Sequence, residues 1–330
     1  MRLASIPLLA ALTLTTACSG FSQKIAMKST SGVLLKASAG LQMESDYELA
    51  RMAIPGSLKT VEGFYVAGPQ GDASDVGDPK GKLVRILTEG YCQYGTAFVE
   101  DDWEAAKFKK DLEAIETHNT RSNHIFTRCL NYALQQLGPR WQKEIFGAPE
   151  VVEKLLKDTP RSKRFALMYA GVALGSLVNH NLTRIEMIGY LPTVEAILNR
   201  VLEMDAKGLP VDPEGTYYAG KVNLTHAALP YVALGMLHSG RAKSMGGDPD
   251  KARAFFEKAL AVTENKMLLP RTLMAYRIGI QTNDQKFFHE QLKIVLETAP
   301  SVWPEQRLAN EVAHRKARRY LAKEKELFIQ

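Results

Sequence analysis

Apolar residues recur every three or four positions along most of the chain, which is the spacing of one buried helix face. In the segment 249–263, for example, Ala252, Phe256 and Ala259 share a face that charged residues flank. Alternating strand patterns are almost absent, and the one candidate, "EGFYVAG", also fits a helix. The pattern therefore predicts an all-α fold with helices over residues 46–66 (interrupted by Pro55), 79–99, 102–137, 149–157, 162–179, 184–204, 216–238, 249–263, 268–281, 284–298 and 304–326.

The stretch "MGGDPDKARAFFEKAL" carries the strongest local signal for a helix start. Gly246 and Gly247 can adopt positive φ without steric cost, so they are suited to reversing the chain. Asp248 is a typical N-cap residue, and Pro249 fits the first helical position because its missing N–H would have no partner there. We expect these four residues to act as turn and cap, with a role in folding only.

Three predicted helices resemble one another, and each follows another apolar helix. They read "PTVEAILNRVLEMD", "PDKARAFFEKALAVTE" and "KFFHEQLKIVLETAP". Leu260 lies 58 residues after Leu202, and Leu296 lies 36 residues after Leu260. The second interval is close to the roughly 34-residue tetratricopeptide period. The pattern predicts stacked antiparallel helix pairs, as in degenerate tetratricopeptide-like (TPR-like) repeats, and the alternative is three similar helices in a bundle without repeats.

The N-terminus has the features of an export signal: Arg2, an apolar run from Ile6 to Leu14, and small residues before Cys18. Cysteine directly after such a site resembles a bacterial lipobox, which implies cleavage before Cys18 and lipidation of its sulfur. Ser19 in the next position resembles outer-membrane sorting. We thus expect a signal peptide over residues 1–17, a lipidated tether over 18–44 and a single helical TPR-like domain over 45–330. The alternative is an ordinary secretory signal.

Cleavage would leave two cysteines, Cys92 and Cys129. They could pair in an oxidising periplasm. Both lie in predicted helices, and the sequence does not bring their Cα atoms within bridging distance. We expect two buried free thiols.

Composition and charge exclude several classes of function. The chain has 330 residues and a net charge of +6, and its basic residues are not interleaved with aromatic ones, which argues against nucleic-acid binding. The basic run "HRKARRYLAK" fits a solvated helix face, and "EDDWE" (100–104) fits helix-start electrostatics better than a calcium site. Catalytic, phosphate-binding and metal-binding motifs are missing from the sequence, so we expect no enzyme, no cofactor and no metal.

Aromatic and polar residues near one predicted helix are the best candidates for a ligand site. Tyr217, Tyr218, Asn223, His226 and Tyr231 fall in "TYYAGKVNLTHAALPY", within the helix predicted over 216–238. Ligand clefts are mostly apolar and carry a few polar groups, such as Tyr hydroxyls, that orient the ligand. The alternative, which we favour, is that they pack in the core and hydrogen-bond internally.

The order of motifs resembles the TatT family, the TPR-type lipoproteins associated with TRAP transporters. The resemblance covers the chain from about Asp46 to Phe328 and is most specific at "GGDPDKARAFFEKAL" and "GYCQYGTAFVE". It implies an all-helical periplasmic protein built on TPR-like helix pairs, and it suggests a homotrimer. It also implies a TRAP solute-binding protein as partner and a cleft or pore for a small hydrophobic ligand. The rival expectation is an envelope scaffold without a small-molecule ligand.

Overall fold

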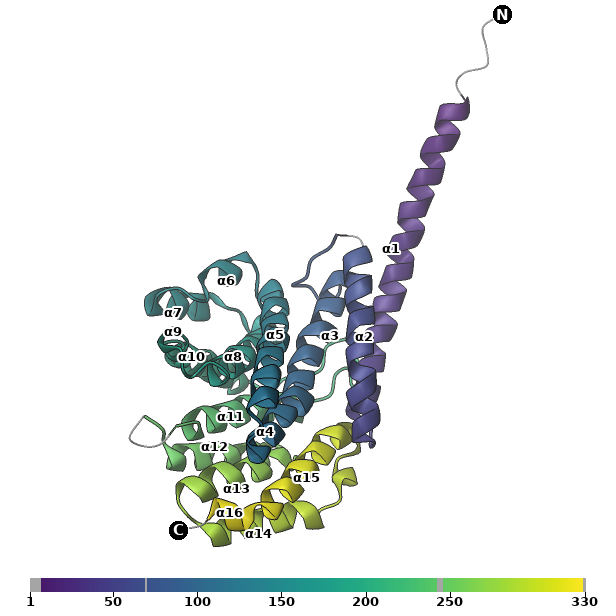
Figure 1. The fold of residues 1–330 in the computed structure, drawn as a ribbon. Coiled ribbons are helices and arrows are strands. Elements are labelled where there is room, and N and C mark those ends of the chain that lie inside the picture. The colour runs from purple at the N-terminus through teal and green to yellow at the C-terminus, as the bar shows by residue number, and fades with distance from the viewer. Residues whose placement is uncertain (1–6, 69, 242–245, 329–330) are drawn as a thin grey trace, which may run out of the picture.

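The computed structural model describes residues 7–68, 70–241 and 246–328, and within these ranges it contains helices and no β-strand. One isolated bridge pairs Val211 with Val222. The all-α prediction is confirmed. Figure 1 shows the helices packed into one body, from which the N-terminal part of α1 projects.

The helices follow one another with short connections. They are α1 (Pro7–Gln42), α2 (Tyr47–Ala67), α3 (Pro79–Tyr94), a π-helical turn (Gly95–Val99), α4 (Glu100–Lys109), α5 (Leu112–Leu137), α6 (Pro139–Glu144), α7 (Pro149–Asp158), α8 (Arg164–Asn179), α9 (Ile185–Ile188), α10 (Leu191–Asp205), α11 (Leu224–Ser239), α12 (Pro249–Val262), α13 (Leu269–Gln281), α14 (Gln285–Glu297), α15 (Arg307–Ala322) and α16 (Glu324–Leu327).

Side-chain caps start several of these helices. The Asp248 carboxylate accepts a hydrogen bond from the amide of Lys251 at 2.9 Å, Pro249 is the first residue of α12, and Gly246 has a φ of 81°. Gly247 is buried. Such a cap satisfies an amide that has no partner within the helix.

Two predicted boundaries are wrong within the first half of the chain. The helix expected over 102–137 is divided at Lys110, which has a φ of 56°, and Asp111 caps α5 by accepting from the amide of Ala114. Conversely, α2 continues through Pro55 without a break. Ile54 before the proline and Leu58 after it are both buried, so packing holds the helix on each side of Pro55.

The helix expected over 216–238 begins only at Leu224. Residues 206–223 form a loop, in which Gly215 and Gly220 have positive φ values that an α-helix does not allow. Tyr217 and Tyr218 therefore lie on this loop and not on α11.

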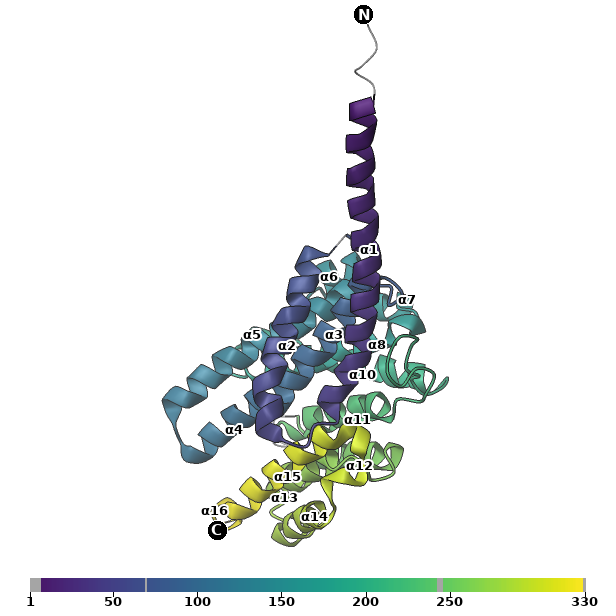
Figure 2. The ribbon, with the colours of Figure 1, turned by 90° about the vertical axis from the view of Figure 1, so that its right-hand side faces the viewer.

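The tether predicted over residues 18–44 has a different conformation in the structure. Helix α1 runs to Gln42, and its C-terminal part packs along α3, with Leu35 and Ala39 buried. Figure 2 shows this part of α1 lying across the body. Residues 1–6 and the side chains before Lys24 fall outside the description, so the signal peptide and lipidation at Cys18 stay predictions.

From α8 onward the helices pack in sequence order, as α8 with α10, α11 with α12 and α13 with α14, each pair resting on the next (Figure 1). All three pairs share a close contact between a glycine on the first helix and a bulky side chain on the second. A Cβ on Gly171 would lie 2.9 Å from Ile197, and one on Gly235 would lie 2.7 Å from the Phe256 ring. Gly279 faces Phe288 in the same way. This recurrence supports the TPR-like repeat, which stays a prediction.

Candidate functional site

A cavity of about 330 Å³ lies between the helices of the body. It is bordered by residues of α1, α2, α3, α8, α11, α13 and α15, so its walls come from both ends of the chain. Most of the wall is apolar and includes Leu58, Ile86, Leu229, Val232, Leu273 and Val312. Small residues such as Gly175 and Ala233 also line it, and their lack of bulk leaves space between the helices.

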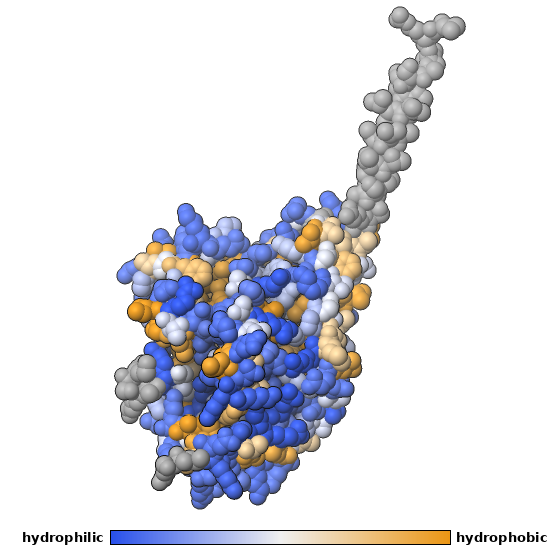
Figure 3. All heavy atoms as spheres, viewed as in Figure 1, coloured by the Kyte–Doolittle hydropathy of each residue, from blue (hydrophilic) through white to orange (hydrophobic). Residues whose placement is uncertain are grey.

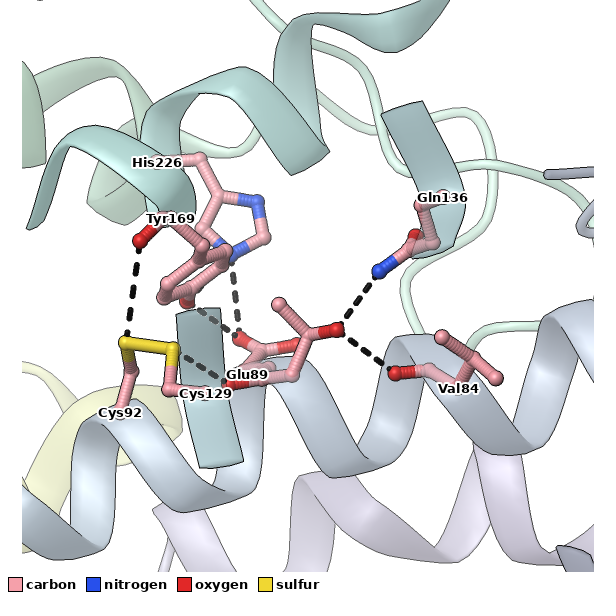
Figure 4. The surroundings of a disulfide bond; sticks show 8 residues. Val84, Glu89, Cys92, Cys129, Gln136, Tyr169 and His226 are labelled. Atoms are coloured by element: carbon pink, nitrogen blue, oxygen red, sulfur yellow. Dashed lines mark hydrogen bonds and ion pairs between the residues drawn. A yellow bond between two sulfur atoms is a disulfide. The ribbon is translucent and has the colours of Figure 1, made fainter. Parts of the chain in front are cut away.

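Glu89 on α3 is the most connected polar residue in this wall. Its Oε1 accepts hydrogen bonds from Gln42 of α1 at 3.3 Å, from Gln93 at 3.1 Å and from the Tyr169 hydroxyl of α8 at 3.3 Å. The Nε2 of His226 on α11 lies 3.0 Å away. One carboxylate thus joins four helices beside the cavity, and Figure 4 shows its contacts with Tyr169 and His226.

The surroundings of Glu89 favour its ionised form. Burial by itself raises the pKa of this carboxyl, but the His226 ring and the Arg85 guanidinium outweigh burial and lower the pKa below its ordinary value. Burial and the Glu89 charge raise the pKa of Tyr169 well above its usual range, so its hydroxyl keeps its proton. The network therefore holds a fixed negative charge, to which the Tyr169 hydroxyl donates.

A disulfide bond stands next to this network. Cys92 and Cys129 are bonded at 2.04 Å and join α3 to α5 (Figure 4). The expectation of two free thiols was wrong because the packing of α3 on α5 brings the Cα atoms to 5.3 Å, a distance that the sequence does not reveal. Cys92 also borders the cavity.

The two charged motifs of the sequence meet each other across the body. Asp101 of α4 is fully buried and accepts from Arg315 at 3.0 Å and from Arg319 at 2.5 Å on α15. Glu104 accepts from Lys316 at 3.0 Å. Thus "EDDWE" not only starts α4 but also forms ion pairs with α15. Only part of the basic run is a solvated face, because Arg315 is exposed whereas Lys316 is buried.

A model of the family described as "TRAP transporter T-component" matches residues 43–328. The chain belongs to this family. The match supports an accessory role in a TRAP transport system. A search of curated proteins finds no match.

The five ligand candidates of this T-component do not line the cavity. Tyr217 is 59% exposed on the loop before α11. Asn223 is the N-cap of α11, where its side chain accepts from the amide of His226 and donates to Asp212. Tyr231 packs near Phe255.

His226 is the candidate that lies nearest to the site, because Glu89 and Tyr169, its two partners, both line the cavity. Glu89 itself was missed. Its signal was an acidic residue four positions after Arg85, within the otherwise apolar stretch "LVRILTEGY". Charges in such a stretch are buried and need partners.

The residues that the structure describes contain no cluster of three or more side chains suited to a metal ion. None of their helices has the length and apolar character needed to cross a bilayer.

Proposed function

We propose that this T-component is a lipid-anchored periplasmic accessory protein that receives a small apolar ligand in its central cavity and docks a TRAP solute-binding protein. The observation that supports ligand handling is the cavity itself. Its walls are mainly apolar and its volume of about 330 Å³ falls within the range of small-molecule sites. A scaffold that only assembles other proteins has no use for such a space.

The chemistry of the wall favours ligands with a hydrocarbon part. Transfer of apolar surface from water to side chains such as Leu229 and Val232 is the main favourable term in binding. The Glu89 network adds polar groups that are already hydrogen-bonded to one another, so a ligand need not satisfy them.

The docking surface is proposed on α1 and α2. Exposed apolar side chains occur there, among them Ile25 and Val33 of α1 and Met52 and Val66 of α2. Figure 3 shows apolar colouring along this side of the body. Clustered exposed apolar side chains are typical of protein contact sites. The same surface could instead form the homotrimer that the family resemblance suggests, and the experiment below distinguishes the two.

The docking proposal is tested by co-purification of the tagged chain with a TRAP solute-binding protein from the same cells. We expect to recover a complex with the solute-binding protein, and we expect Met52→Glu to lower its yield. Glu290→Gln, at an exposed position of α14, is the control and should leave the yield unchanged. Recovery of outer-membrane assembly proteins without a solute-binding protein would favour the scaffold function. A trimer without a partner would assign the surface to self-association.

Anchoring is tested separately. The N-terminal part of α1 projects from the body, which suits a chain that is held at a membrane through Cys18 (Figure 1). Cys18→Ser should move the protein from the membrane fraction to the soluble periplasm. Equal fractions for both forms would contradict lipidation.

A further inference from the structure

The carboxylates that line the cavity all have partners. Glu89 bonds to His226 and its neighbours, and Glu100 lies 3.2 Å from Nε2 of His180. Glu104 is paired with Lys316 and accepts from the Tyr320 hydroxyl. Lys316 also pairs with Asp101. Each carboxylate of this wall therefore already has a hydrogen-bond or ion-pair partner within the protein.

Arg277 on α13 differs from these groups. It lines the cavity, and among the described residues no hydrogen bond or ion pair to its guanidinium is found. Its Nε is buried without a partner. A buried donor without an acceptor is unfavourable, so the structure leaves a place for an acceptor here. Arg241 also lines the cavity, and it adjoins residues 242–245, which lie outside the description.

A second cation lies next to Arg277, because α4 and α13 meet through the rings of Phe108 and Tyr276, whose centroids are 5.9 Å apart. Lys107 of α4 lies over the ring of Trp103, another residue of the cavity wall, at 4.3 Å from the ring centroid. Burial lowers the pKa of Lys107, and the charge of Arg277 lowers it further. Two like charges held close together attract an anion more strongly than either one alone. Glu104, whose charge also acts on Lys107, already pairs with Lys316 and Arg319 of α15.

We propose that Arg277 binds the anionic headgroup of an amphipathic ligand, a monocarboxylate whose hydrocarbon part lies along the apolar wall. The proposal rests on the cavity being a ligand site. The planar guanidinium presents paired donors that match the two oxygens of a carboxylate. The ionised Glu89 in the same cavity repels an anion, so the headgroup is directed to Arg277. Leu273, one turn earlier on α13, continues the apolar wall from this point.

The test compares octanoate with octanol by isothermal titration calorimetry on the purified full chain. Both share one hydrocarbon tail, and only octanoate has the charge. Octanoate is expected to bind at least about tenfold more tightly, as one charge-assisted hydrogen bond allows. Arg277→Gln should remove this preference while leaving octanol binding unchanged. Arg318→Gln, an exposed site on α15, is the matched control and should behave as wild type.

Each outcome decides between the two proposals. Equal binding of octanoate and octanol to the wild type would overturn the role of Arg277 and leave the apolar cavity standing. An Arg277→Gln variant that still binds octanoate more tightly than octanol would also overturn the role of Arg277. If neither compound binds the wild type, the ligand cavity itself is wrong and this inference falls with it. The wild-type comparison needs no variant, so a misfolded variant does not prevent the test.

Discussion

At the scale of single residues, Glu89 shows how one side chain can organise a site. It was not among the sequence candidates, because nothing in the local pattern places Gln42, Tyr169 and His226 around it. Those partners come from three other helices. The cap at Asp248, by contrast, depends on neighbours within four residues and could be predicted. Local chemistry is visible in a sequence, and partners brought by folding are not.

Removal of the charge at Glu89 should destabilise the fold. Glu89→Gln leaves four partners around a neutral amide that cannot accept from all of them, and we expect a loss of roughly 1–3 kcal/mol in the free energy of unfolding. Urea denaturation measures it. Glu290→Gln, at an exposed site on α14, should change stability by less than about 0.5 kcal/mol. Equal effects of the two substitutions would show that the network is not important for stability.

The glycine contacts predict opposite results for one substitution at two sites. Gly235→Ala places a methyl group against the fully buried Phe256 ring, so we expect a loss of about 1–3 kcal/mol. Gly63→Ala on α2 meets open space and should gain about 0.5–1 kcal/mol from helix propensity. Thermal or urea unfolding compares them. A Gly235→Ala protein as stable as Gly63→Ala would contradict the close helix contact.

At the scale of elements, helices were predicted well where an apolar stripe and a cap coincide, as in the segment 249–263. Helix boundaries were predicted wrongly where the backbone conformation of single residues ends or starts a helix. The break at Lys110 needs a left-handed residue that no sequence pattern announces, and the loop before Leu224 keeps apolar side chains that resemble a helix face. Helix α1 was missed because its part after residue 18 is rich in Ser, Lys and Gly and has no sustained apolar stripe, and contacts with α3 stabilise it.

The disulfide is the strongest constraint between two elements. Cys92 and Cys129 are 37 residues apart, and closing a loop of that size stabilises a fold by roughly 2–4 kcal/mol. The double variant Cys92→Ala/Cys129→Ala should lose about this much in urea denaturation. Reductant should lower the stability of the wild type and leave the double variant unchanged. Insensitivity of the wild type to reductant would contradict the bond.

At the scale of the molecule, the Asp101 cluster joins α4 to α15 and so connects the two halves of the chain. Burial alone raises the pKa of Asp101, but Lys316 and Arg319 outweigh it and hold the pKa far below its ordinary value. A lowered pKa in the folded state means that the stabilisation is complete above the unfolded value of about 3.9 and is lost as the pH falls below it.

Asp101→Asn should therefore destabilise the protein strongly at neutral pH, by roughly 3–5 kcal/mol, because the cations on α15 lose their buried partner. The difference between variant and wild type should shrink as the pH falls below about 4, because the carboxyl of the unfolded chain takes up a proton there while the native carboxyl, with its lowered pKa, is still ionised. Urea denaturation across this range measures both. A difference that stays constant with pH would show that Asp101 is not ionised in the fold.

The cavity is the feature that sequence reasoning could least predict. Its wall takes residues from many helices, with the largest shares from α3, α8 and α11, and the sequence does not show which of them face one common space. The family resemblance suggested a pore or cleft, yet the aromatic and polar residues proposed as its lining lie on a loop, at a helix cap or packed against other helices. A space between helices depends on which side chains are small, such as Ala233, and that becomes visible only after packing.

The most direct test of the account is crystallographic. Crystals of the chain soaked with bromo-octane should show anomalous bromine density inside the cavity, among Leu229, Val232 and Leu273. Ala233→Phe should abolish this density because the added ring fills the space, whereas Ala261→Phe, on the exposed face of α12, should keep it. Bromine found only on the outer surface, or equally in both variants, would contradict a central apolar ligand site.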